Sequence, residues 1–136
     1  MTKIRLTKEF RFEMAHALWN YDGRCKNLHG HSYIFQVTVI GAPCRDKNNP
    51  KYGMVMDFGE LKAIVKEEIV EPMDHSVAIS DQAPTEQLIQ LPQMTDRYHI
   101  MNYQPTCENL LVDFAERITA RLPEGVELFS LRLHET

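Results

Sequence analysis

Two long segments near the N-terminus alternate between apolar and polar residues, and this alternation constrains the fold more than any other feature of the chain. Residues 4–17 and 31–40 follow a period of two, which predicts β-strands with one face toward a core. The second segment, HSYIFQVTVI, is also rich in the β-branched and aromatic residues that strands favour. The faces expected to point inward carry Phe10, Phe12, Met14 and His16 on one strand, and His31, Tyr33, Phe35, Val37 and Val39 on the other.

Three further elements are expected after the second strand. A short strand is predicted at residues 54–58, and a capping box at 57–60 then begins a helix that ends near Pro72. Thr106 is a suitable N-cap for a second helix that continues to about residue 122.

The last two segments are a long connection and a final strand. Residues 76–104 contain Pro84 and Pro92 and no sustained period, so we expect a long loop with at most one helical turn near residues 86–91. Residues 126–135 predict a strand whose inward face carries Phe129, Leu131, Leu133 and Glu135.

This order of elements is an α+β layout, and 136 residues are expected to form one domain, residues 1–136. A largely antiparallel sheet with both helices on one face is the simplest packing. In so short a chain the other face would be covered by a partner subunit, so we expect a homo-oligomer.

Charge and composition exclude several classes of protein. The 15 Lys and Arg against 19 Asp and Glu give a net charge of −4, which argues against a nucleic-acid or acidic-membrane binder. No stretch resembles a membrane span or an export signal. The three cysteines contain no CxxC pair, so free thiols and a cytoplasmic location are expected.

A cluster of histidines suggests a metal site. His29 and His31 are two apart on a predicted strand, so their side chains share a face. His16 lies on the apolar face of the first strand and would join them if the two strands pair. Three histidines leave one tetrahedral position of zinc open, which is the catalytic pattern. The spacing alone also allows three histidines that are satisfied separately.

The cysteines differ in what surrounds them. Cys25 lies four residues before His29, between Arg24 and Lys26, where its thiolate would be favoured and could act as a general base. It could instead be an inert loop cysteine or a fourth zinc ligand. Cys107 is expected in the first turn of a helix, where the dipole lowers a thiol pKa, but we interpret it as structural. Cys44 carries no signal.

Several charged residues are candidates for proton transfer or ligand binding. Asp74 and His75 could orient one another for proton transfer, or form a polar helix exit. Glu135 shares a face with apolar residues, and its carboxylate suits a ligand with two adjacent N–H donors. Glu108 is more simply a residue that stabilises the helix dipole. The two histidines without an evident partner are expected at the surface; these are His99 and His134.

Taken together, these residues resemble the 6-pyruvoyltetrahydropterin synthase / 6-carboxytetrahydropterin synthase family. The resemblance covers almost the whole chain, and the order of its pieces makes coincidence a poor explanation. The matching pieces are Phe12-Glu-Met-Ala-His16, Cys25-Lys-Asn-Leu-His29-Gly-His31-Ser, Met56-Asp-Phe58, Met73-Asp-His75, Pro105-Thr-Cys-Glu-Asn109 and His134-Glu-Thr136.

The resemblance implies more than the spacing does. It implies the tunnelling fold, in which trimers close their sheets into a barrel and two barrels stack into a hexamer. It also implies roles for the matching residues: zinc ligands His16, His29 and His31; a catalytic base Cys25, supported by Asp74 and His75 across a subunit interface; and a pterin anchor Glu135, helped by the region of Thr106 and Glu108.

The activity implied is conversion of 7,8-dihydroneopterin triphosphate to 6-carboxytetrahydropterin, with zinc as cofactor, on the route to queuosine and other 7-deazapurines. The alternative is the 6-pyruvoyltetrahydropterin synthase of the biopterin pathway, which shares the same residues. A non-catalytic zinc- or pterin-binding module is an alternative of another class. The segment 76–104 is longer than in compact family members, so its contribution to the pocket is open.

Overall fold

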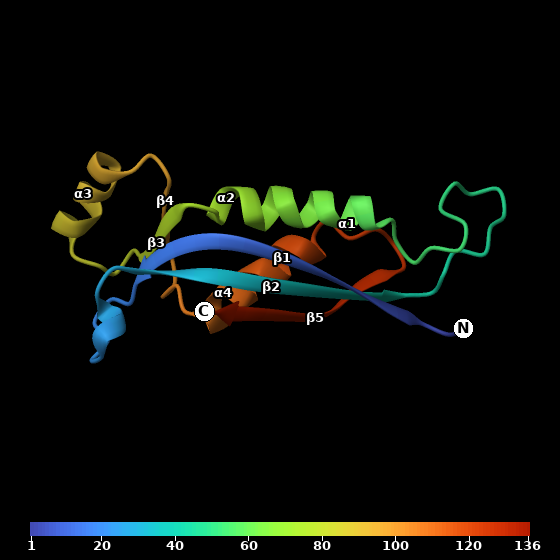
Figure 1. Ribbon diagram of the computed structural model, residues 1–136, viewed down its shortest axis with the longest axis horizontal. Helices are drawn as coiled ribbons and strands as arrows, with labels where there is room; N and C mark the ends of the chain where they lie inside the picture. The colour runs from blue at the N-terminus through green and yellow to red at the C-terminus, as the bar shows by residue number, and fades with distance from the viewer.

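The computed structural model describes residues 1–136 and is organised around a five-stranded sheet of order β4-β3-β1-β2-β5 (Figure 1). β1 (Ile4–Ala17) pairs antiparallel with β2 (His29–Gly41), which pairs antiparallel with β5 (Val126–Glu135). β3 (Ser76–Ser80) runs parallel to β1, and β4 (Tyr98–Met101) runs parallel to β3. The predicted α+β class is confirmed, and the sheet is mixed because the two short strands are added parallel to the antiparallel three.

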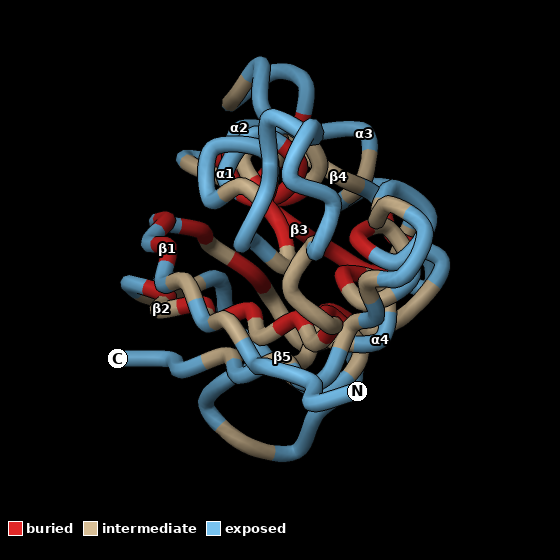
Figure 2. Tube along the Cα trace, turned by 90° about the vertical axis from the view of Figure 1, so that its right-hand side faces the viewer, coloured by how far each residue is buried: buried red, intermediate tan, exposed pale blue.

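Helices cover one face of the sheet (Figure 1). α1 (Phe58–Val65) continues through a π-helical segment (Lys66–Val70) into α2 (Glu71–Met73), and α4 (Cys107–Thr119) packs against the π-helical segment and β5. The buried positions of Figure 2 lie between these helices and the sheet. None of the helices combines the length and apolar composition that a membrane span requires. The core includes the fully buried Tyr33, Phe35, Leu61, Ile69, Leu110 and Phe114.

Both long helices begin at capped residues. The Asp57 carboxylate accepts the Gly59 N–H at 2.7 Å, and the Thr106 hydroxyl accepts the Asn109 N–H at 3.2 Å. Each cap satisfies a backbone donor that has no partner inside the helix. The predicted helix starts are confirmed, but the short strand expected at 54–58 is wrong. Asp57 caps a helix there, and Phe58 is already helical.

The first helix ends at Met73, next to the expected Pro72. Pro72 has no N–H to donate to the carbonyl four residues earlier, on Glu68. The Arg117 guanidinium of α4 donates to that Glu68 carbonyl instead, at 3.1 Å. This contact ties α4 to the π-helical segment, where the backbone hydrogen bonds are already irregular.

The long loop expected at 76–104 is wrong, because this segment contains β3, α3 (Thr85–Met94) and β4. β3 lies between β1 and β4 and is largely buried, so it shows no alternation of polar and apolar residues. α3 has no side-chain cap and contains a proline. A small second core anchors the insertion and consists of Ile79, Ala83 and Leu91.

The inward face predicted for the last strand is interrupted. The register between β2 and β5 shifts between Thr38 and Val39, so Ser130 pairs with Thr38 and Leu128 with Val39. Phe129 is therefore exposed rather than inward, and the Arg5 guanidinium lies 4.5 Å from its ring centroid. The positions beyond the shift keep the predicted face and include Leu131 and Leu133, which pack against the core.

The face of the sheet without helices is polar. The Thr7 and Thr38 hydroxyls are 2.8 Å apart, and Gln36 Nε2 donates to the Glu9 carboxylate at 3.2 Å. Water can solvate such a face, so this face of the sheet does not need a partner subunit to cover it. The outer edges of β4 and β5 are unpaired in the single chain.

Candidate metal centre and adjoining cavity

Three histidines converge where β1 ends and β2 begins. The strand register places His16 opposite His29 and Met14 opposite His31. The ring centroids are 4.5 Å apart for His16 and His29, 4.9 Å for His29 and His31, and 5.2 Å for His16 and His31. One ligand nitrogen from each ring lies within 4.8 Å of the others, as a shared metal site requires.

Each ring is oriented by a backbone carbonyl that faces its Nδ1 atom. These backbone oxygens can only accept, so each Nδ1 donates the hydrogen bond, and Nε2 is the ring nitrogen that remains to bind a metal. Histidines that bind a metal are usually oriented in this way, with the other ring nitrogen hydrogen-bonded to an acceptor. The carbonyl partners are Pro105 for His16 at 2.7 Å, Asn27 for His29 at 2.7 Å and Thr136 for His31 at 3.2 Å.

Two of these Nε2 atoms face each other directly. The Nε2 atoms of His16 and His29 are 3.0 Å apart. Burial lowers the pKa of His16 despite the hydrogen bond to Pro105, so this ring is neutral near pH 7. A cation held between the two nitrogens would satisfy both lone pairs at this separation. The donor set therefore fits a divalent metal such as zinc with three protein ligands and an open position.

A cavity of about 460 Å³ opens beside the histidines, a volume in the range of small-molecule sites. It brings together most of the residues that the sequence singled out, from the β1–β2 loop, the start of α4 and the end of β5. Trp19, Tyr21 and Gln104 also line it, and the sequence analysis assigned them no role. The predicted site residues in its wall are His16, Cys25, His29, Thr106, Glu108 and Glu135.

Cys25 lies in a single 3₁₀ turn, Arg24–Lys26, within the β1–β2 loop. Its carbonyl accepts the Leu18 N–H at 3.0 Å, which ties the loop back to the end of β1. The side chain is exposed and borders the cavity beside His16 and His29. Cys44 lies outside this cavity, in the segment that precedes α1.

Glu135 ends β5 and lies beside the metal centre. One of its carboxylate oxygens is 3.6 Å from the Nε2 atom of His31. Directly opposite Glu135 in the ladder is Tyr33, which is fully buried and whose hydroxyl has no hydrogen-bond partner. Burial and the nearby Glu135 charge raise the pKa of Tyr33 far above its usual value. The sequence marked Tyr33 only as core, although its position two residues after His31 on the same face could have signalled a role.

The first turn of α4 contributes Thr106, Cys107 and Glu108 to the cavity. The expectation that the helix dipole lowers the pKa of Cys107 is wrong. Burial and the Glu135 carboxylate raise the pKa of Cys107 to about 12, so the side chain remains a neutral thiol. Thr106 is occupied as the helix cap, and Glu108 is exposed.

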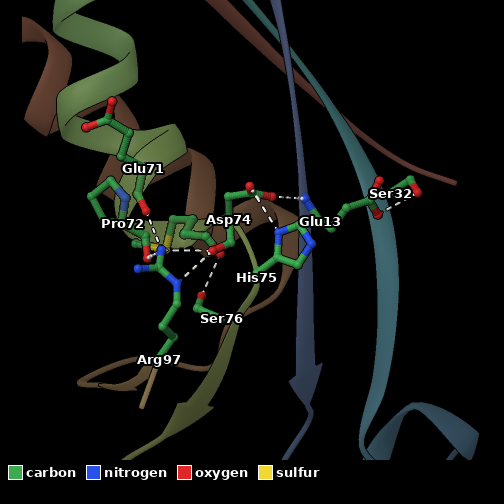
Figure 3. Close-up of polar contacts among 9 residues, drawn as sticks. Glu13, Ser32, Glu71, Pro72, Asp74, His75, Ser76 and Arg97 are labelled. Atoms are coloured by element: carbon green, nitrogen blue, oxygen red, sulfur yellow. Dashed lines mark hydrogen bonds and ion pairs between the residues drawn. The ribbon is translucent and has the colours of Figure 1, made fainter. Parts of the chain in front are cut away.

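Asp74 and His75 do not border this cavity in the single chain. They follow α2, and His75 lines an open depression of about 510 Å³ together with Glu13, Ser32 and His31. Figure 3 shows Asp74 and His75 beside Glu13. The Asp74 carboxylate accepts the Glu13 N–H at 2.8 Å and lies 3.0 Å from His75 Nδ1. Burial acts to raise the pKa of Asp74, but these two contacts and the Arg97 charge outweigh it and lower the pKa.

One of the two histidines expected at the surface has a structural partner. His99 on β4 is half-buried, and its Nε2 lies 2.7 Å from the Pro72 carbonyl. The expectation for His99 is wrong, because the parallel pairing of β4 brings this ring under α2. His134 is exposed, as expected.

Comparison with known proteins shows which family this chain is similar to. A family model described as 6-pyruvoyl tetrahydropterin synthase matches residues 5–136. The 6-carboxy-5,6,7,8-tetrahydropterin synthase of Haemophilus influenzae is 38% identical over 135 residues, which cover 98% of this chain and 93% of that protein. The protein of the same name from Rickettsia felis is 31% identical over 136 residues, covering 98% and 94% of the two chains.

Solved structures show the same arrangement of sheet and helices. A protein of unknown function from Wolinella succinogenes has a TM-score of 0.75 at 20% identity, over 100% of this chain and 94% of that one. The 6-pyruvoyl tetrahydropterin synthase of Plasmodium falciparum has a TM-score of 0.69 at 16% identity, over 100% of both chains. The fold that the sequence resemblance implies for the single chain, a sheet with helices on one face, is thereby confirmed.

Proposed function

Because the chain belongs to the 6-pyruvoyl tetrahydropterin synthase family, we propose that it is a zinc-dependent 6-carboxy-5,6,7,8-tetrahydropterin synthase. The substrate is 7,8-dihydroneopterin triphosphate, and the products are 6-carboxytetrahydropterin, acetaldehyde and triphosphate. The pathway is queuosine and 7-deazapurine biosynthesis. The names of the relatives that align over nearly the full chain favour this product over the pyruvoyl one.

The observation that carries the proposal is the convergence of three histidine nitrogens within 4.8 Å of one another, with each ring oriented through Nδ1 by a backbone oxygen. Zinc bound there by His16, His29 and His31 would supply Lewis-acid chemistry to the hydroxyls of the substrate side chain. An open coordination position beside a cavity is what a catalytic metal needs, whereas a structural zinc is closed by a fourth protein ligand.

The other side chains around the cavity have separate roles in proton transfer and ligand binding. Cys25 as thiolate moves a proton at the substrate side chain, since it is exposed and borders the cavity next to the histidines. Glu135 accepts the paired N–H groups of the pterin edge with its two oxygens. Thr106 and Glu108 form the rim that steadies the ring.

Assembly would supply the remaining pair. Neither Asp74 nor His75 lines the cavity of its own chain, so we propose that they act at the cavity of a neighbouring copy. The unpaired edge of β5 offers a row of backbone donors and acceptors for strand pairing between copies. The proposed assembly is a homotrimer or a hexamer of two trimers, with the polar face lining a barrel.

The test is incubation of the zinc-loaded protein with 7,8-dihydroneopterin triphosphate, followed by mass spectrometry of the pterin product. We expect 6-carboxytetrahydropterin together with free acetaldehyde. A product that keeps the three-carbon side chain would assign the chain to the pyruvoyl activity instead. Binding of pterin without turnover would assign it to the non-catalytic class.

A further inference from the structure

The carbonyls at the end of α2 are held by side chains from the segment that follows it. The Arg97 guanidinium donates to the carbonyls of Glu71 and Pro72, and to that of Asp74 through both Nε at 3.0 Å and Nη2 at 2.8 Å (Figure 3). His99 lies 2.7 Å from the same Pro72 carbonyl, and the Ser76 hydroxyl donates to the Met73 carbonyl at 2.6 Å. Each of the four carbonyls of residues 71–74 therefore has a side-chain partner.

This arrangement surrounds a backbone conformation that needs support. His75 has a φ of 58°, in the left-handed region that residues with a Cβ rarely adopt. Such a conformation persists where neighbouring contacts over-determine it. On the β1 side, the His75 N–H donates to the Glu13 carbonyl at 2.6 Å, and the Asp74 carboxylate accepts the Glu13 N–H. On the other side, Arg97 holds the turn.

Arg97 touches neither of the two concave surfaces. It lines neither the cavity beside the histidines nor the open depression beside His75. Its backbone is tied to the segment it holds, because the Arg97 carbonyl accepts the Val77 N–H at 3.1 Å. Any influence of Arg97 on a reaction must therefore pass through the residues 71–75 that its side chain holds.

We propose that Arg97 is a positioning residue that holds the Asp74–His75 pair in its working geometry, and that the segment 76–104 brings this guanidinium under α2. The inference rests on the proposed proton-transfer role of Asp74 and His75. A guanidinium suits the task because its planar set of donors reaches three carbonyls at once, which a lysine ammonium on a single flexible stem does not reproduce.

The experiment compares Arg97→Ala, His75→Ala and the double variant Arg97→Ala/His75→Ala with the wild type. We expect Arg97→Ala to lower kcat by about 10–100-fold, the loss that misplacement of a reacting group by about 1 Å can cause. KM, zinc content and oligomer size should stay at the wild-type values. In the His75→Ala background, Arg97→Ala should change kcat by less than about 2-fold, because residues that act through one another are not additive.

The matched control is Arg121→Ala, which removes an exposed arginine paired with Glu67 on the helical side and should leave kcat unchanged. Equal fold losses from Arg97→Ala in the wild-type and His75→Ala backgrounds would overturn the inference, since Arg97 would then act independently of His75. A wild-type kcat in Arg97→Ala would overturn it as well.

The same variants separate failure of the Asp74–His75 role from failure of the Arg97 role. If His75→Ala keeps the wild-type kcat, the proposed role of the pair fails; if His75→Ala loses activity and Arg97→Ala does not, only the role of Arg97 fails. If Arg97→Ala is unfolded at the assay temperature, Arg97→Lys replaces it in the same cycle. We expect this variant to be folded, with an intermediate kcat and the same non-additivity; full additivity would count against the proposal.

Discussion

Tyr33 and Glu135 lie directly opposite each other across the β2–β5 ladder, and the fully buried Tyr33 hydroxyl near the Glu135 carboxylate has no hydrogen-bond partner. A buried hydroxyl without a partner costs about 1–3 kcal/mol, a cost that phenylalanine at the same position would not carry. Tyr33 does not line the cavity, so its hydroxyl can influence a ligand there through Glu135, which does line it.

Tyr33→Phe is therefore expected to raise the free energy of unfolding by about 1 kcal/mol, because it removes an unsatisfied group without changing the packing. The same change should lower kcat/KM by about 10-fold, because the hydroxyl opposite Glu135 would donate one hydrogen bond of roughly 1.4 kcal/mol to that carboxylate once a ligand is bound. Urea unfolding and steady-state kinetics measure the two effects.

Tyr103→Phe is the matched control, and it should change the free energy of unfolding in the opposite direction. The Tyr103 hydroxyl donates to the Asp113 carboxylate, so its loss should destabilise the protein by about 1.5–3 kcal/mol. A Tyr33→Phe variant that is destabilised to the same extent would show that the Tyr33 hydroxyl has a stabilising partner after all.

His29→Ala tests the proposed zinc site of three histidines. Removing one of the three ligands should abolish stoichiometric zinc binding, measured by elemental analysis after dialysis against a weak chelator. The fold should persist, because His29 is not one of the residues of the hydrophobic core. His134→Ala, which changes an exposed histidine, should bind zinc as the wild type does. Zinc retained with unchanged affinity in His29→Ala would refute the three-ligand site.

Cys25→Ala tests the base assignment. We expect turnover to fall by about 10²–10⁴-fold, the usual contribution of a general base, with zinc and oligomeric state unchanged. Cys44→Ala is the control, since Cys44 lies outside the cavity, and should keep wild-type turnover. Stoichiometric loss of zinc in Cys25→Ala would make this residue a fourth ligand and the site a closed one.

Cys107 should behave unlike an ordinary thiol although it borders the same cavity. Since its pKa is raised to about 12, iodoacetamide at pH 8 should label Cys107 slowly. The raised pKa of Cys107 contributes to the stability of the fold at every pH below the thiol pKa of the unfolded chain. This contribution disappears as the pH rises toward 12. The stability advantage of wild type over Cys107→Ala should therefore shrink above about pH 9. Rapid alkylation of Cys107 at pH 8 would contradict this.

The proposed assembly is checked by sedimentation equilibrium at micromolar concentration. We expect a mass of three or six times the 15.8 kDa of one chain. A monomer that persists at these concentrations would leave Asp74 and His75 outside the lining of any cavity beside the histidines. It would then exclude the shared site and the closed barrel together.

The sequence by itself determined the elements whose signals are local. Alternation with a period of two is sufficient to predict β1 and β2 and to place His16 on a buried face, because successive side chains in a strand point to opposite sides. Asp57 and Thr106 mark helix starts because a cap acts within three residues of itself. The convergence of the three histidines then follows from pairing two adjacent strands.

Only the tertiary structure decided the features that join distant parts of the chain. The carbonyls that orient His16 and His31 come from Pro105 and Thr136, 89 and 105 residues away in sequence. The exposure of Phe129 depends on a register shift against β2, and no periodicity within β5 encodes it. β3 is buried between two parallel neighbours and so lacks alternation, which is why the segment that places Arg97 under α2 looked like a loop. Local patterns record which face of an element is buried, whereas register and long-range hydrogen bonds depend on which elements meet.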